Sequence, residues 1–179
     1  MNGVGDVITI EVLGTPAGKG NARAFVNKRT GRAVLASFGS GETAKRLRSW
    51  DALVREAARI AVGEVIAPPF VDTPLAVTLV FRIARPPGHW GKGKSAGMLK
   101  PSAPPFPSVK PDADKLARST LDPLTKVVFD DDSRIVDLAI RKVYAKPGHE
   151  GVTIAVRAAV AVSAPSPARC AVPQEQLGL

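Results

Sequence analysis

The sequence lacks the features of a secreted, membrane-spanning or cysteine-dependent protein. It has one cysteine, Cys170, among 179 residues, which excludes an internal disulfide and any cysteine-based metal cluster. It has no run of about 18 apolar residues, so we expect no membrane span. Its first residues show neither the basic region nor the apolar region of a secretory signal peptide. These absences predict a cytoplasmic protein.

The chain is also poor in the residues of several common catalytic sites. Neither of its two histidines, His89 and His149, lies near a nucleophilic serine or cysteine motif, which gives a hydrolase triad little support. With two histidines and one cysteine, the chain also lacks the ligands of a zinc site. The glycine-rich stretch GTPAGKG lacks the strand–loop–helix context and the terminal Gly-Lys-Ser/Thr of a phosphate-binding loop. We therefore expect no small-molecule cofactor.

Acidic residues are in the minority, and they are unevenly placed. The chain has 25 Lys and Arg against 16 Asp and Glu, a formal net charge of +9. No acid occurs in residues 14–40, which hold five basic residues, or in residues 82–110, which hold six, whereas seven of the sixteen acids fall in residues 112–137. An acidic centre between two basic flanks suits a polyanionic partner, nucleic acid before a membrane surface.

Hydrophobic periodicity predicts a mixed α+β fold. We expect strands where β-branched or alternating apolar residues occur, and helices where apolar residues recur every three to four positions. The expected elements are a strand at 7–13, a long basic loop or ribbon at 14–40, a helix at 42–62, a strand at 75–83, a long loop at 84–109, a short helix at 114–124, and strands at 135–143 and 151–160. Residues 145–150 suit a hairpin between the last two strands. The order predicts a single domain at 1–162, with a mixed β-sheet of about four strands and two main helices, and a disordered tail at 163–179.

Each expected helix has an apolar face. In the first helix, apolar residues recur at helical spacing at Leu47, Trp50, Val54, Ala57 and Ala61. In the second, the residues expected to face inward are Leu116, Thr120, Leu121 and Leu124. Pro123 is expected to kink or shorten the last turn of the second helix, because it removes a backbone donor.

The most informative segment is residues 110–138, KPDADKLARSTLDPLTKVVFDDDSRIVDL. Asp112 and Asp114 stand at the start of the short helix, and a run of three acids, Asp130, Asp131 and Asp132, opens the next strand. If the backbone stays extended as far as Asp114, the first two carboxylates project to the same side. A helix that runs away and a strand that runs back are then expected to bring the two acidic groups together.

Carboxylates gathered in this way repel one another unless a cation compensates them. A hard divalent cation such as Mg²⁺ takes oxygen ligands and keeps waters that a substrate phosphate can displace, and it activates water and polarises the phosphoryl group. Lys115 or Arg118, beside such a site, would stabilise the extra negative charge of the transition state. Structural interpretations also stay open, since an Asp before a helix is commonly an N-cap and a triple Asp is commonly a solvated turn. Asp122 and Asp137 lack a second acid at a useful spacing and are expected to be structural.

Three stretches, in this order, resemble the RusA family of crossover junction endodeoxyribonucleases of bacteria, phages and prophages. They are ITIEVLGTPAGKGNARAFV near the start, RPPGHW in the middle, and KPDADKLARSTLDPLTKVVFDDDSRIVDLAIRKVY. The resemblance covers about residues 8–144, and the final strand fits the end of the family. The combination of KPD-x-D with DDS-x-I-V about one helix later is fairly specific.

The resemblance implies a RusA-like homodimer that binds four-way (Holliday) DNA junctions and nicks opposed strands with Mg²⁺, or with Mn²⁺ as a substitute, in DNA recombination and repair. It would act in a bacterial cell, host or phage-infected. The two acids of KPD-x-D fall on Asp112 and Asp114, and the acid before Ser falls on Asp132, with Asp131 beside it. The implied metal ligands are therefore Asp112, Asp114, Asp131 and Asp132, and the implied catalytic residues are Asp112, Asp114, Asp132 and Arg118.

Basic residues of the two flanks are the expected contacts to the phosphates of the junction arms, with salt-sensitive binding as the consequence. They are Lys19, Arg23, Arg82, Arg85, Lys92, Lys94, Lys110 and Lys115. Trp90 and Phe106, in the long loop, either stack on unpaired bases at the crossover or anchor the loop to the body. A two-fold dimer suits a substrate that is itself roughly two-fold.

Two positions depart from the family pattern. The basic residue four positions after the second acid is usually lysine and is Arg118 here, and the asparagine that commonly follows that acid is Lys115. Arginine presents its charge in a planar fork and does not simply replace lysine. These departures favour a second hypothesis, a non-catalytic protein that binds junctions or other DNA. A third hypothesis is a metal-dependent nuclease acting on RNA, on flaps or on other branched DNA.

Overall fold

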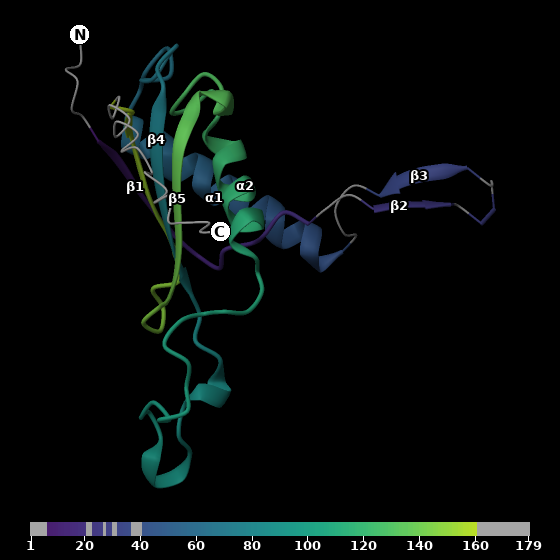
Figure 1. Cartoon of the computed structure of the whole chain (residues 1–179), viewed down its shortest axis with the longest axis vertical. Helices are drawn as coiled ribbons and strands as arrows, with labels where there is room; N and C mark the ends of the chain where they lie inside the picture. The colour runs from purple at the N-terminus through teal and green to yellow at the C-terminus, as the bar shows by residue number, and fades with distance from the viewer. Residues whose placement is uncertain (1–6, 21–22, 27, 30–31, 37–40, 161–179) are drawn as a thin grey trace, which may run out of the picture.

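The structure, a computed structural model, describes residues 7–160 apart from 21–22, 27, 30–31 and 37–40. The expected tail at 163–179, with Cys170, lies outside the described residues. A four-stranded mixed sheet is the centre of the fold (Figure 1). Its strand order is β1 (Ile8–Leu13), β6 (Gly151–Ala158), β4 (Leu75–Ile83) and β5 (Ile135–Tyr144). This sheet and its two main helices confirm the predicted α+β fold.

The predicted hairpin between the last two strands is wrong. β4 lies between β5 and β6, and it pairs parallel with the former and antiparallel with the latter. β4 is the more continuously apolar strand, with Leu75, Val77, Leu79 and Phe81 almost fully buried, so a central place that pairs both of its edges buries the most apolar surface. The turn after β5 instead passes the end of β4, where Ala145 N donates to the carbonyl of Ile83 at 2.9 Å.

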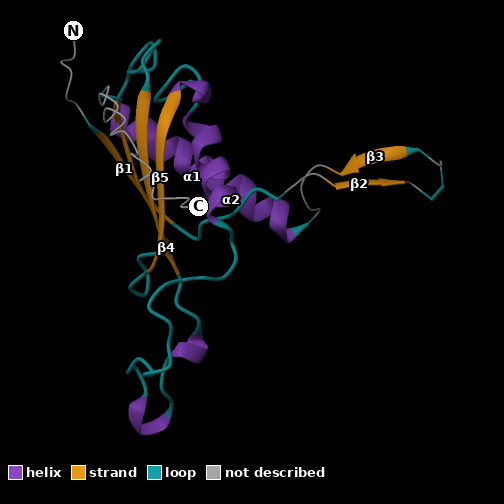
Figure 2. Ribbon diagram, in the orientation of Figure 1, coloured by secondary structure: helices purple, strands orange, loops and turns teal. Residues whose placement is uncertain are grey.

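Both helices cover the same face of the sheet (Figures 1 and 2). α1 (Glu42–Val62) packs against β1, and α2 (Ala113–Leu121) packs against α1 and β5. The buried face of α1 consists of Trp50, Val54 and Ala58, whereas Ala61 is exposed, so the apolar stripe differs from the predicted one at its last turn. The two helices are joined by a buried hydrogen bond from the indole Nε1 of Trp50 to the hydroxyl of Thr120, at 3.2 Å.

The end of α2 is short, as Pro123 predicts. The helix stops at Leu121, and the chain continues as the 3₁₀ turn η3 (Asp122–Leu124). Leu116, Thr120 and Leu124 are fully buried, as expected. No helix in the described residues is long and apolar enough to cross a membrane.

Two extensions leave the body of the protein (Figure 1). To one side, the antiparallel pair β2 (Arg23–Val26) and β3 (Ala33–Ala36) forms a narrow ribbon, which is one of the two forms expected of residues 14–40. Below the sheet, residues 84–111 form a second extension, called the lobe here (Figure 2). It contains two 3₁₀ turns, η1 (Pro87–His89) and η2 (Gly93–Ser95).

The lobe is held together by its own hydrogen bonds. Gly91 N donates to the carbonyl of Met98 at 2.9 Å, and Lys100 N donates to the carbonyl of His89 at 3.0 Å. Glycine and proline exclude long regular elements there, as expected, but they do not exclude local order. The lobe is therefore a folded projection, and it leads directly into the acids at the start of α2.

Candidate metal and DNA-binding site

Asp112 and Asp114 lie at the start of α2, one at the N-cap position and one in the first turn. Because Asp114 is already helical, the expected extended backbone through Asp114 is wrong. The Asp112 side chain makes no capping hydrogen bond; its Oδ2 instead accepts a hydrogen bond from Lys115 Nζ at 2.5 Å. The N-cap interpretation therefore holds for the position of Asp112 but not for its carboxylate. That carboxylate is 43% exposed, so it is accessible to a ligand.

The lysines around Asp112 keep it ionised. The hydrogen bond and the charge of Lys115 hold the pKa of Asp112 below its ordinary value, and the charges of Lys110 and Lys142 act in the same direction. An ionised carboxylate is the form that binds a divalent cation. The same lysines place positive charge where a DNA phosphate would approach.

Lys142, which the sequence analysis did not select, fixes the backbone just before these acids. From β5, its Nζ donates to the carbonyls of Val109 and Pro111, at 2.6 and 2.8 Å. Its role becomes visible only with the register of the sheet. Lys142 occupies a register position opposite the buried Phe81, on the inward face of the strand, where a lysine needs polar partners.

The chain near Gly18 closes the other side of this region. Lys19 N donates to the carbonyl of Lys115 at 3.0 Å. A Cβ added at Gly18 would lie 3.2 Å from Pro111 Cβ and 3.3 Å from Lys115 Cβ, so a side chain there would have to displace its neighbours. The start of α2 is therefore held by β5 on one side and by the strand-to-ribbon connection on the other.

The three acids after α2 have different surroundings. Asp131 Oδ1 accepts a hydrogen bond from Ser133 N at 2.9 Å and caps the 3₁₀ turn η4 (Asp132–Arg134), and the hydrogen bonds from Ser133 hold the pKa of Asp131 below its ordinary value. Asp132 is exposed. Asp130 is more buried, with 22% of its side chain exposed, and lies 3.6 Å from Arg134. Asp131 and Asp132 therefore face solvent, while the side chain of Asp130 is largely buried.

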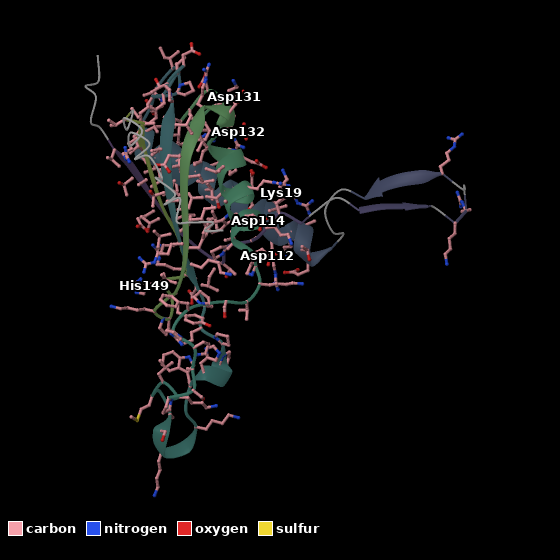
Figure 3. The ribbon with its side chains drawn as sticks, in the orientation of Figure 1. Lys19, Asp112, Asp114, Asp131, Asp132 and His149 are labelled. Carbon is pink, nitrogen blue, oxygen red and sulfur yellow. The ribbon has the colours of Figure 1, made fainter. Side chains whose placement is uncertain are left out.

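The structure does not bring the two acidic groups together within the chain. Asp112 and Asp114 lie toward one end of α2, and Asp131 and Asp132 toward the other (Figure 3). Among the described residues, no group of three or more His, Cys, Asp or Glu side chains is arranged to hold a metal ion. The expected convergence is wrong because the second acidic group opens β5 beyond the far end of α2. Only the end of β5 returns to the start of the helix, where Lys142 contacts Val109 and Pro111.

The donor set at the start of α2 nevertheless fits a hard cation. Mg²⁺ is commonly held by one or two carboxylates, with waters and substrate phosphates completing its shell. Asp112 and Asp114 supply two such carboxylates, and both stand on ordered backbone. Any further carboxylate ligand has to come from elsewhere than this end of α2.

Arg82 is engaged inside the sheet. Its Nε donates to the carbonyl of His149 at 2.9 Å, and its two Nη groups contact the hydroxyl of Thr153 and the carboxylate of Glu11. These contacts occupy the guanidinium on the sheet face that the helices leave uncovered. The guanidinium of Arg82 is therefore occupied by partners within the chain.

Lys19 and Arg85 also have partners within the chain. Lys19 lies beside α2 (Figure 3), where its Nζ pairs with Asp122 Oδ2 at 2.5 Å, which gives Asp122 the structural role expected of it. The Arg85 guanidinium lies 3.8 Å from the centre of the Tyr144 ring and donates to the carbonyl of Pro104 at 3.1 Å. Arg85 therefore attaches the lobe to the end of β5.

The exposed cations of the lobe are Lys92, Lys94, Lys100 and Lys110. Phe106 is 58% exposed, while Trp90 is half-buried and lines a small cavity together with Ala145, Pro147 and Glu150 of the turn after β5. The anchoring interpretation therefore fits Trp90, and stacking on a base remains available to Phe106. The side chain of Arg23, on the ribbon, lies outside the described residues.

A family model, described as Endodeoxyribonuclease RusA, matches residues 14–157. The matched range contains both helices, the lobe, three of the four sheet strands up to Arg157, and both acidic groups. None of the curated proteins matches the chain.

Proposed function

Because the chain belongs to the RusA family of endodeoxyribonucleases, we propose that it is a Mg²⁺-dependent enzyme that binds four-way DNA junctions and hydrolyses phosphodiesters in opposed strands. The observation that supports this most is the Asp112–Asp114 pair at the start of α2, surrounded by lysines, in a chain of net charge +9. Paired carboxylates beside cations suit a metal ion that meets a DNA phosphate. Such an enzyme would serve DNA recombination and repair.

The residues at the start of α2 have distinct roles in this proposal. Asp112 and Asp114 hold the cation, which supplies Lewis-acid polarisation of the phosphate and activation of water when bound. Lys115 keeps Asp112 ionised. Arg118 is exposed and lies four residues after Asp114, on the same face of α2, so its guanidinium is placed to neutralise charge that develops on the phosphoryl oxygens.

In this proposal, a homodimer gives the second acidic group its role. Asp131 and Asp132 do not join the Asp112–Asp114 pair of the same chain, and both acidic groups are accessible to solvent. A partner subunit related by a two-fold axis near α2 would bring its own Asp132 to the Asp112–Asp114 pair of this chain. This chain would supply Asp132 to the partner in the same way, since an isologous interface repeats every contact. Two such sites would match two opposed strands of a junction.

The DNA surface of the proposal is the basic side of the lobe together with the start of α2. Lys92, Lys94, Lys100 and Lys110 are exposed and no acid occurs in residues 82–110, so junction arms would meet positive charge on the way to the acids. Phosphate contacts of this kind position the substrate and release counterions, so binding is expected to weaken steeply with salt.

The experiment that tests the proposal is cleavage of a synthetic four-way junction with a matched duplex as control. We expect symmetric nicks with Mg²⁺, none with EDTA, and a loss of about 10²-fold or more in rate for Asp114→Asn, with junction binding retained. Asp122→Asn is the matched control, because Asp122 lies on the same segment and its carboxylate pairs with Lys19. Full activity of Asp114→Asn, or nicking without a divalent cation, would refute the metal mechanism.

One observation favours a non-catalytic alternative. Lys115 Nζ donates to Asp112 Oδ2 at 2.5 Å, and it occupies an oxygen through which Asp112 would bind a metal ion. If that bond persists on DNA, the protein binds junctions without cutting them. Tight junction binding with no nicks in Mg²⁺ or Mn²⁺ would support this alternative, and preferential cutting of a flap or of RNA would support a nuclease of different specificity.

A further inference from the structure

A cavity of about 310 Å³ opens beside the start of α2. Its walls come from residues 15–18, the first two turns of α1, the end of β4, and Pro111. Pro111 directly precedes Asp112, and Gly18 lies close against Pro111 and Lys115. The cavity therefore shares a wall with the proposed metal site but contains none of its acids.

The chemistry of the walls suits a flat ring with polar edges. Pro16, Ile83 and Pro111 present hydrocarbon surface, and Thr15, Thr43 and Arg46 add hydroxyl and guanidinium groups. No acid is among the described residues that line the cavity, although Arg46 pairs with Glu42 on α1 at 3.1 Å. Pockets that receive an extruded base combine apolar or aromatic walls with a few hydrogen-bonding groups for the edge of the base, which is the combination found here.

The size of the cavity limits what it can hold. Ligand pockets commonly measure about 300–1,000 Å³, so this cavity stands at the lower end of that range. It has room for one small ring system and not for a stretch of nucleic acid. A single nucleobase meets the limits of size, polarity and charge together, because its phosphate would stay outside, near the lysines at the start of α2.

We propose that this cavity receives one unstacked nucleobase from the strand whose phosphodiester lies at Asp112 and Asp114. The proposal rests on the function proposed above, since it needs a branched DNA at this site. Bases at a branch point have lost part of their stacking, so they are the ones least costly to extrude. A captured base would fix which phosphodiester of the strand lies at the acids, because Pro111 in the cavity wall directly precedes Asp112.

The test uses a four-way junction with 2-aminopurine beside the scissile phosphate, in EDTA so that no cutting occurs. The fluorescence of this base analogue rises when it leaves the stack. We expect a several-fold rise on binding of the wild-type protein. Two substitutions that enlarge lining side chains from different elements, Ala84→Leu after β4 and Thr43→Leu on α1, should abolish the rise, and Ala61→Leu, an exposed position elsewhere on α1, should not.

Cleavage provides a second readout of the same variants. In Mg²⁺, Ala84→Leu and Thr43→Leu should cut about tenfold more slowly than Ala61→Leu, a loss typical of one base contact. Asp114→Asn should keep the full fluorescence rise, because it leaves the cavity intact.

The outcomes separate this proposal from the one it rests on. A junction that binds with no rise in fluorescence, or a rise that both cavity-filling variants retain, overturns the base pocket and leaves the nuclease proposal standing. Failure of the wild-type protein to bind any branched DNA overturns both. A rise that is lost in both filled variants and kept in Ala61→Leu supports the pocket.

Discussion

Lys142 shows how a single side chain can link the sheet to the acids. It leaves the inward face of β5, where its neighbours in register are apolar, and it places its ammonium against two carbonyls of the backbone that precedes Asp112. Charged hydrogen bonds of this kind are stronger than neutral ones, so the backbone before the acids is held more tightly than an ordinary loop. Lys142 therefore positions the backbone of the acids without contacting their carboxylates through these two hydrogen bonds.

Replacing Lys142 by methionine should therefore slow cleavage more than it weakens binding. We expect a rate loss of at least about tenfold for Lys142→Met, because small displacements of catalytic groups are costly, with junction affinity changed little. Arg141→Met, one residue earlier and exposed, is the matched control and should retain the wild-type rate. Equal rates for the two variants would show that the contacts of Lys142 do not position the acids.

The Trp50–Thr120 hydrogen bond gives a prediction about stability. Thr120→Val keeps the shape of the side chain but leaves the buried indole N–H without its acceptor, which should lower the free energy of unfolding by about 1–3 kcal/mol. Thr120→Ser keeps the hydroxyl and loses only a methyl group, so it should cost about 1 kcal/mol. Urea denaturation measures both, and a valine variant as stable as the serine variant would contradict the role given to this bond.

At this scale the sequence indicated candidate residues but not where their side chains lie. Asp112, Asp114 and Asp132 stand in two short motifs, KPD-x-D and DDS, that can be recognised without a structure. Whether their carboxylates meet depends on how β5 runs past α2 in space, and local pattern does not fix that arrangement. Lys142 was missed because a lysine in a strand is ordinarily taken as solvent-facing, and its inward position is known only once the register with β4 is known.

Among the elements, β6 depends most on a glycine. Gly151, its first residue, has a φ of +155, and a Cβ added there would lie 1.9 Å from the carbonyl oxygen of Val12 on β1. The close approach lets β6 begin its pairing with β1 and β4 at once after the turn. No other residue fits both the angle and the space.

Gly151→Ala should therefore destabilise the protein by about 3 kcal/mol or more, since backbone strain and overpacking add. Gly148→Ala is the matched control. Gly148 also has a positive φ, +79, but a Cβ there would meet nothing within 4 Å, so only the conformational cost of about 1–2 kcal/mol applies. Thermal denaturation of the two variants should differ accordingly, and similar midpoints would contradict the contact with Val12.

The lobe gives a prediction about DNA. If Lys92 and Lys94 each neutralise a phosphate, replacing both by alanine should weaken junction binding and reduce the slope of log K against log salt by about two. The matched control replaces Arg48 and Arg59, two exposed arginines of α1 away from the lobe, and should leave the slope unchanged. An unchanged slope for the lobe variant would mean that the lobe does not contact phosphates.

Element bounds followed closely from the sequence, and element pairing did not. The helix at 42–62 and the strand at 75–83 match α1 and β4 residue for residue, because their periodicity and their glycine or proline boundaries are local properties. Whether β5 pairs with β6 or with β4 depends on which strand gains most from a central place, and that is a competition within the whole sheet. The order inside the lobe was likewise hidden, since contacts to Tyr144 come from another element.

For the whole molecule, the separation of the two acidic groups makes the dimer testable. Asp114→Asn and Asp132→Asn should each be inactive alone. When the two variants are mixed and allowed to exchange subunits, each mixed dimer has two sites. One of them combines an intact Asp114 with an intact Asp132 from the other chain, and the other has both acids replaced. Nicking of a single strand should therefore return. Mixtures that stay inactive although mixed dimers form would show that each site is completed within one chain.

The place of β6 in the sheet has a consequence for biosynthesis. The last of the four described sheet strands in chain order, β6, is inserted between the first, β1, and β4, so that Ile8 pairs with Val156. In the described sheet β1 has no other neighbouring strand, and the sheet therefore cannot close until translation has passed residue 158. Pairings so distant in sequence form slowly, and unpaired edges are exposed in the meantime. A nascent chain stalled before Gly151 would already contain all of the candidate acids, yet it would have no complete sheet to hold them, which ties the proposed DNA cutting to the synthesis of β6.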